Sequence, residues 1–183
     1  MKALTKLQIL AFSGLLVLSC STTDTVENSK GLALYTVRDD MGKDPMVTLQ
    51  AVADAGYKYI EAAGYNEGKF YGMEPEEFKK KAEELGLVAI SSHQGTVTLD
   101  NADEMIADVK AAGIKYFVIP VPPMGHFSYD TETQTLNMSD SVELITDILR
   151  TIGEKCKAQG IEMLYHNHAF EFVPNSRGII PMD

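Results

Sequence analysis

One short segment, Leu164–Phe172, concentrates the residues of this chain that are best suited to chemistry. It holds two of the four histidines, His166 and His168, with the carboxamide of Asn167 between them. Residues i and i+2 of a strand face the same side, so we expect the two imidazoles to project together and Asn167 to point away. Glu171 comes three residues after His168, and only a bend would bring its carboxylate to the same site.

These side chains can serve two kinds of chemistry. Two imidazoles on one face can bind a divalent metal ion or the hydroxyl groups of a sugar. A carboxylate beside them can bind a hard cation such as Mn²⁺ or Mg²⁺, or act as a base. In the competing interpretation one histidine satisfies a buried carbonyl and Glu171 is solvated. The density of the cluster favours the functional interpretation.

The composition indicates a folded acidic domain. The chain has 183 residues, of which 45% are hydrophobic and 23% charged, and these values are typical of a globular protein. Its length suffices for one domain with a good core. The formal net charge is −10, from 16 basic and 26 acidic residues. An acidic chain repels phosphate backbones, which argues against nucleic acid as a partner.

The amino-terminal residues have the pattern of an export signal. Two lysines precede an apolar stretch that is too short to span a bilayer. The following Val17-Leu18-Ser19-Cys20 resembles a bacterial lipobox. We therefore expect a signal peptide over 1–19, a lipid anchor on Cys20 and a polar tether over 20–30. This predicts an exported, membrane-anchored bacterial lipoprotein, in the periplasm or at the cell surface. An ordinary signal peptide with an incidental cysteine is the alternative.

The rest of the chain repeats one theme. Four times a helical pattern ends at a glycine and an apolar run follows at once, at Gly56, Gly86, Gly113 and Gly160. Glycine adopts the left-handed conformation that ends a helix without steric cost. Strands that alternate with helices of this length form right-handed crossovers and a parallel sheet. The pattern predicts the α/β class.

The expected elements follow from this repeat and from prolines in the first turns of two helices. We expect strands over 31–37, 57–62, 88–92, 116–121 and 162–166, and helices over 45–55, 75–85, 102–112 and 141–159.

A doubly wound sheet and a (β/α)8 barrel both fit this order. No Gly-rich phosphate-binding loop occurs, and polar residues instead follow several strands, namely Arg38, Glu61, His93 and His166. Catalytic groups from the carboxyl ends of several strands are typical of a barrel. A complete barrel takes about 250 residues. We therefore expect residues 31–183 to form a partial, C-terminally truncated TIM barrel with about five strands and four helices.

A resemblance makes the expectation more specific. Tyr165–Phe172, which reads YHNHAFEF, resembles the motif of the sugar phosphate isomerase/epimerase family, the xylose isomerase-like TIM barrels. Gly31–Arg38 resembles the first strand of that family, Gly56–Glu61 its second and Ser91–His93 its third. The resemblance covers about 31–183 in matching order.

The resemblance implies a divalent metal ion, Mn²⁺, Mg²⁺, Co²⁺ or Zn²⁺, at the barrel mouth. Such an ion polarises the carbonyl and hydroxyl groups of a sugar while a carboxylate moves the proton. Glu171 and His168 are then the expected catalytic residues, and Glu171, His166 or His168 fills one metal-ligand position. The expected substrate contacts are Arg38, His93 and His166. Further ligands of the family come from later strands.

Three functions are compatible with these residues. The first is an isomerase or epimerase that acts on a keto-sugar or cyclitol, with activity weakened by the absent ligands. The second is a non-catalytic lipoprotein that binds a carbohydrate or a partner, and that pairs with a second copy of itself. The third is a related inosose-type dehydratase or lyase. Glu61 is left open between support of a metal site and a salt bridge.

Overall fold

The computed structural model describes residues 30–138, 141–175 and 178–183. The predicted signal peptide, the lipid anchor on Cys20 and almost all of the tether lie outside these residues, so they stay predictions. Within the described ranges, no helix is long and apolar enough to cross a membrane.

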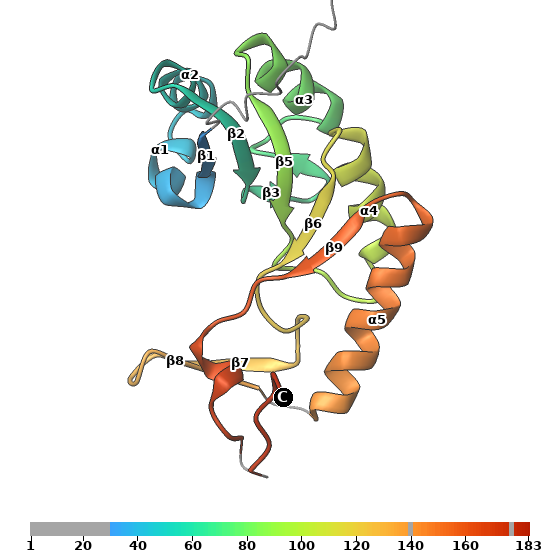
Figure 1. Ribbon diagram of the computed structural model, residues 1–183. Coiled ribbons are helices and arrows are strands. Elements are labelled where there is room, and N and C mark those ends of the chain that lie inside the picture. Colours follow the sequence, from blue (N-terminus) through green and yellow to red (C-terminus); the bar gives the residue numbers. More distant parts are fainter. Residues whose placement is uncertain (1–29, 139–140, 176–177) are drawn as a thin grey trace, which may run out of the picture.

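Five parallel strands form the central sheet (Figure 1). In spatial order they are β1 (Lys30–Ala33), β2 (Tyr57–Ala62), β5 (Val88–His93), β6 (Tyr116–Ile119) and β9 (Glu162–Tyr165). All four neighbouring pairs are parallel, and β1 and β9 are the two edges of an open sheet. This confirms the expected α/β class and the order of the strands along the chain.

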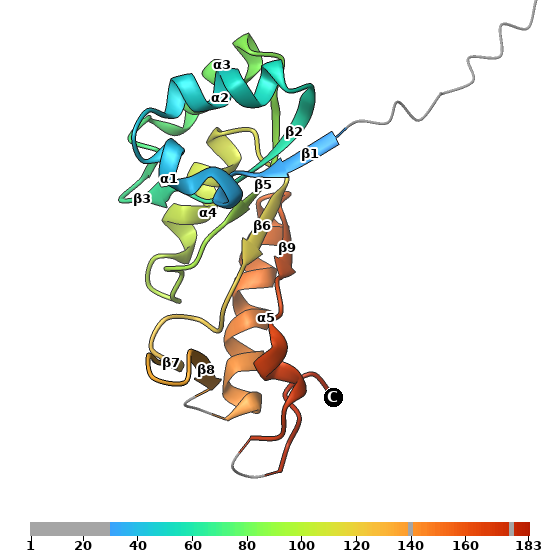
Figure 2. The same cartoon turned by 90° about the vertical axis from the view of Figure 1, so that its left-hand side faces the viewer.

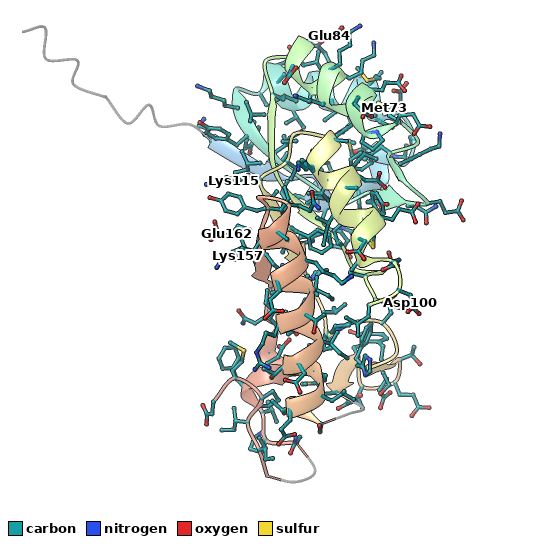
Figure 3. All side chains as sticks on the ribbon, turned by 90° about the vertical axis from the view of Figure 1, so that its right-hand side faces the viewer. Met73, Glu84, Asp100, Lys115, Lys157 and Glu162 are labelled. Carbon is teal, nitrogen blue, oxygen red and sulfur yellow. The ribbon has the colours of Figure 1, made fainter. Side chains whose placement is uncertain are left out.

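Four longer helices connect these strands. They are α2 (Pro45–Asp54), α3 (Pro75–Glu84), α4 (Ala102–Ala111) and α5 (Val142–Ala158). In Figure 1, α3, α4 and α5 lie on one side of the sheet, and Figure 3 views the molecule from that side. Figure 2 shows an elongated molecule with α2 and α3 at one end and the carboxyl-terminal segment at the other.

The helix boundaries have identifiable local causes. The Asp44 side chain accepts hydrogen bonds from the backbone N–H groups of Met46 and Val47, and this caps α2. Ser141 caps α5 in the same way, accepting from Leu144 N–H at 3.1 Å. The four glycines of the repeat have φ values between 71° and 81°. This is the left-handed backbone conformation that commonly ends an α-helix.

The core lies between the sheet and the helices. It is built from side chains that are at most 1% exposed, including Ile60, Phe78, Ile106, Phe117 and Ile152. Burying such side chains against one another is the main source of folding free energy.

The face of the sheet away from these helices is less covered. A Cβ atom at Gly153 of α5 would lie 3.6 Å from Met163 Cε, so Met163 of β9 faces the helices. Because side chains alternate along a strand, Leu164 projects to the opposite face. Leu164 is 40% exposed, and Val88 of β5 is 43% exposed.

The first strand is shorter than expected. It ends at Ala33, and the chain continues as the 3₁₀ turn η1 (Leu34–Val37) and the short helix α1 (Arg38–Met41). Leu34 and Met41 are buried. The backbone of η1 and α1 directs the side chains of Leu34 and Met41 into the core. A strand continued to Val37 would run away from the core.

Two hairpins were not expected from the sequence. Tyr65–Asn66 (β3) pairs with Lys69–Phe70 (β4), and Phe127–Asp130 (β7) pairs with Thr135–Met138 (β8). Strand β6 also ends earlier than expected, at Ile119, because Pro120 follows and has no N–H group for the ladder.

Figure 3 locates the two ends of the sheet. Lys115, Lys157 and Glu162 lie together at the amino end of β9, whereas Asp100, in the loop after β5, lies toward the carboxyl end. The polar residues that the sequence places after the strands belong to this second end.

Truncating a core residue of α5 tests the packing of that helix. Ile152 is fully buried, and Ile152→Ala removes apolar contacts and leaves a cavity. We expect the free energy of unfolding, measured by urea titration with circular dichroism, to fall by about 2–5 kcal/mol. Leu144→Ala on the same helix is the control, because Leu144 is 45% exposed. Its effect should stay within about 0.5 kcal/mol. Equal effects of the two variants would contradict this packing.

Candidate functional site at the carboxyl ends of the strands

Three strands bring polar side chains together at the carboxyl end of the sheet. Glu61 is in β2, His93 is the last residue of β5, and His166 follows β9. His93 Nε2 lies 3.1 Å from Glu61 Oε1 and 3.3 Å from His166 Nδ1. We call these residues the Glu61–His93–His166 cluster. The cluster brings together three of the four residues that we expected after strands; Arg38 is the fourth.

The neighbouring strand holds the Glu61 carboxylate in place. Ser91 pairs with Glu61 across β2 and β5, and its Oγ donates a hydrogen bond of 2.7 Å to Glu61 Oε2. The other oxygen, Oε1, faces His93. The side chains of His93 and Glu61 are 15% and 25% exposed. Both carboxylate oxygens therefore have partners, while the pair still reaches solvent.

The cluster shifts the pKa values of two of its members. The hydrogen bond with His93 is the main cause that lowers the pKa of Glu61. Burial opposes it, and the hydrogen bond from Ser91 and the charges of His93 and His166 add to the lowering, so that the net shift is downward. The pKa of His166 is lowered first by desolvation of the ring and then by the nearby His93 and His168. Near neutral pH, Glu61 is therefore ionised and His166 is neutral.

These charge states favour one placement of the ring protons. An ionised carboxylate only accepts hydrogen bonds, so the contact of 3.1 Å between Glu61 Oε1 and His93 Nε2 favours a proton on that nitrogen. His166 Nδ1 then presents a lone pair to this N–H group, and the proton of the neutral His166 ring lies on Nε2. In this arrangement the N–H group of His93 Nε2 lies between the Glu61 carboxylate and the Nδ1 atom of His166.

His168 extends the row of rings away from the cluster. Its ring stacks on His166 with a centroid distance of 4.8 Å and an interplanar angle of 10°. Phe170 stacks on the other side of His168 at 5.9 Å and 18°. The sequence expectation that His166 and His168 project together is met, although β9 ends at Tyr165 and the two histidines lie just beyond it.

Glu171 is buried in the turn that follows the two histidines. The chain bends into the 3₁₀ turn η2 (Ala169–Phe172), and the Glu171 carboxylate is only 2% exposed. It accepts a hydrogen bond of 2.7 Å from the Tyr165 hydroxyl and another of 2.7 Å from the His168 backbone N–H. Burial, followed by this hydrogen bond, raises the pKa of Tyr165. Each of the two oxygens keeps a second lone pair, and the expected catalytic or metal-binding role of Glu171 stays a prediction.

Arg38 is not brought to the cluster by any contact of the described structure. Its guanidinium donates to the Tyr35 carbonyl at 3.0 Å and lies 4.6 Å from the centre of the Tyr35 ring. The side chain is exposed. The expected contact between Arg38 and a substrate stays a prediction.

The described residues do not form a metal shell. Among them, no group of three His, Cys, Asp or Glu side chains is placed to hold a metal ion. The parallel rings of His166 and His168 direct their in-plane lone pairs along parallel planes instead of toward one point. The expected metal-ligand position at Glu171, His166 or His168 stays a prediction.

Cys156 takes no part in this chemistry. It is fully buried in α5, and burial raises the pKa of its thiol to about 11. A protonated, buried thiol is inert as a nucleophile.

Sequence reasoning missed two members of the site network. Ser91 orients Glu61, and Tyr165 holds Glu171. A signal for Ser91 existed, because it lies two residues before His93 on the same strand and shares its face. Tyr165 gave no signal, since its role depends on a bend that the spacing does not reveal.

No protein-family model matches this chain, and no curated protein matches it. Solved structures do match. A crystal structure of a sugar phosphate isomerase/epimerase from Parabacteroides distasonis ATCC 8503 matches with a TM-score of 0.60 and 28% identity, over 79% of this chain and 56% of that chain. A second such structure from the same organism gives a TM-score of 0.63 and 25% identity, over 88% of this chain and 61% of that one.

A more distant match is a crystal structure of the IOLI protein with a binding zinc atom. It has a TM-score of 0.51 and 11% identity, and the match covers 74% of this chain and 50% of that chain. At this identity the likeness shows the fold alone.

The matches confirm the resemblance and the fold that the sequence indicated. The chain is structurally similar to sugar phosphate isomerase/epimerases, and its open parallel sheet is that of a partial TIM barrel. It spans 56% and 61% of the length of the two Parabacteroides chains.

Removing the Glu61 charge tests the electrostatics of the cluster. A carboxyl group whose pKa is lowered by folding stabilises the fold above its ordinary pKa, here 4.5, and this stability is lost as the pH falls through the folded-state pKa. We expect Glu61→Gln to melt below the unsubstituted chain at pH 7. The two melting temperatures should converge as the pH falls below 4.5 and through the lowered pKa of Glu61.

The matched control is Glu154→Gln, an exposed glutamate on α5. Its melting temperature should track that of the unsubstituted chain across the same pH range. A gap between Glu61→Gln and the unsubstituted chain that is independent of pH would contradict the assigned charge on Glu61.

Proposed function

We propose that this chain carries the part of a sugar isomerase/epimerase-like barrel that binds a keto-sugar or cyclitol and moves a proton on it. One observation carries the proposal: the Glu61–His93–His166 cluster lies at the carboxyl end of the sheet, in a fold matched at 28% identity by a sugar phosphate isomerase/epimerase. In barrels of this kind that end of the strands holds the active site.

The cluster can bind sugar hydroxyls and take up a proton. The neutral His166 ring is exposed and offers an N–H donor at Nε2, which suits a hydroxyl oxygen. If the cluster removes a proton from the substrate, that proton goes to the free lone pair at His166 Nδ1 once its contact with His93 opens, and His166 becomes an imidazolium. The ionised Glu61, 3.1 Å from His93, stabilises that positive charge. His168 and Phe170 add ring faces beside it.

A divalent metal ion is the part of this proposal that the described residues support least. In a family reaction such an ion polarises the carbonyl group of the sugar. The described residues do not complete a site for it, so binding Mn²⁺, Mg²⁺, Co²⁺ or Zn²⁺ would need further ligands. The steps proposed for this chain therefore use its own side chains alone.

Binding without turnover is the second candidate function. The burial of Glu171 favours it, because the carboxylate expected to act as a base is held by Tyr165 and by the His168 backbone. A dehydratase or lyase would use the same cluster and differ only in its product.

Titration of the full chain with a panel of keto-sugars and inososes tests the proposal. We expect calorimetry to detect binding of at least one compound, and His93→Ala to weaken it about ten- to hundredfold because a charge-assisted hydrogen-bond network is broken. The matched control is His126→Ala, in the loop after β6, which should bind as the unsubstituted chain does. Equal weakening by both variants, or no binding by any compound, would reject the proposal.

Product analysis in deuterated water separates the candidate functions. Proton NMR of the bound compound should show exchange of a carbon-bound hydrogen next to the carbonyl for deuterium if the cluster moves a proton. Elimination of water would instead identify a dehydratase. An unchanged spectrum alongside measurable binding would favour the non-catalytic function.

A further inference from the structure

The hairpin β3–β4 follows β2 directly and has an unusual backbone. Glu67, in its turn, has φ 49°, and Tyr71, just after β4, has φ 52°. Residues other than glycine rarely adopt such positive values, and a bulky aromatic residue does so only when its surroundings impose the conformation. The contacts of Tyr71 supply that constraint.

Tyr71 contacts the backbone immediately after β2 through two hydrogen bonds and its ring. Its hydroxyl accepts a hydrogen bond of 2.8 Å from the Ala63 backbone N–H. Its own backbone N–H donates to the Gly64 carbonyl at 2.9 Å. A Cβ atom at Gly64 would lie 2.1 Å from Cε1 of the Tyr71 ring, so the ring lies directly against the glycine backbone. Only glycine leaves room for the ring there.

The helices hold Tyr71 in turn. Its ring packs against Phe78 of α3 with a centroid distance of 5.8 Å, and Phe70 stacks on the same phenylalanine at 5.2 Å. Phe70 and Phe78 are fully buried. On the other side of the hairpin, the Tyr65 hydroxyl donates to Asp108 of α4 at 2.6 Å. The Tyr71 ring is thus held by aromatic packing on α3, whereas the Tyr65 bond to α4 involves neither Tyr71 nor Ala63 nor Gly64.

The two residues that Tyr71 contacts follow Glu61 closely in the chain. Ala63 and Gly64 come two and three residues after Glu61. Glu61 pairs with Ala33 of β1 and with Ser91 of β5, and the β2–β5 pairing shifts register just before it, between Ile60 and Glu61. Strand β2 ends at Ala62, so the contacts of Tyr71 hold the two residues that come directly after the ladder. Glu61 must nevertheless present one oxygen to Ser91 and the other to His93, which needs a defined backbone.

We propose that Tyr71 is a positioning residue for the site: its hydroxyl and ring clamp Ala63 and Gly64, and so hold the end of β2 where Glu61 meets His93. The role rests on the proposed function in so far as Glu61 serves a sugar. Burial raises the pKa of Tyr71 to about 12, with a further contribution from the charge of Glu61, so the phenol stays neutral beside the carboxylate.

The test compares two tyrosine hydroxyls on one hairpin. Tyr71→Phe keeps the ring and removes the bond to Ala63, and Tyr65→Phe removes the bond to Asp108 on the other side. The readout is the titration of Glu61, followed by carbon NMR of the side-chain carboxyl in the full chain. We expect Tyr71→Phe to move the pKa of Glu61 up toward its ordinary value of 4.5, and Tyr65→Phe to leave it in place.

Sugar affinity is the second readout, and Gly64→Ala is a second variant that displaces the Tyr71 ring. Affinity for the sugar found by calorimetry should fall about tenfold in Tyr71→Phe and stay unchanged in Tyr65→Phe. Gly64→Ala, which pushes the ring away, should raise the pKa of Glu61 as Tyr71→Phe does. An unshifted Glu61 in Tyr71→Phe, or an equal shift in Tyr65→Phe, would overturn the clamp. The titration needs no sugar, so its outcome is separate from that of the proposed function.

Discussion

The site depends on a hydrogen bond between two neighbouring strands, from His93 at the end of β5 to Glu61 in β2, at 3.1 Å. A partly buried carboxylate is stable only if its oxygens are satisfied, and His93 and Ser91 satisfy both. This bond requires parallel strands in a fixed register, which the helices and their glycine ends impose. The fold therefore lowers the pKa of Glu61 and keeps the carboxylate ionised to lower pH, and the ionised carboxylate favours a proton on His93 Nε2.

The two carboxylates near the site serve different purposes. Glu61 keeps its charge close to solvent and can stabilise a positive imidazole. Glu171 is buried and organises the bend after β9, where its bonds to Tyr165 and to the His168 backbone turn the chain back on itself. That bend brings the His168 ring onto His166. One carboxylate thus lies close to solvent, and the other shapes the loop that carries the histidines.

The sequence predicted the parts of the fold that have strong local signals. Glycines after helices and prolines in first turns located the four long helices and the five strands of the sheet within a few residues. The hairpins β3–β4 and β7–β8 have strands of four residues or fewer, too short for a periodic pattern. The convergence of Glu61, His93 and His166 was only partly predictable, since it depends on strand order. Tyr71 was missed because its contacts come from the fold.

The central claim is that one proton lies between Glu61 and His93 and is presented to a neutral His166. Nitrogen NMR of the histidine rings at pH 7 tests it most directly, because a protonated and a bare ring nitrogen have well-separated shifts. We expect a protonated Nε2 on His93, and on His166 a bare Nδ1 with a protonated Nε2. A bare Nε2 on His93 would contradict this placement of the protons, since Glu61 would then face a lone pair.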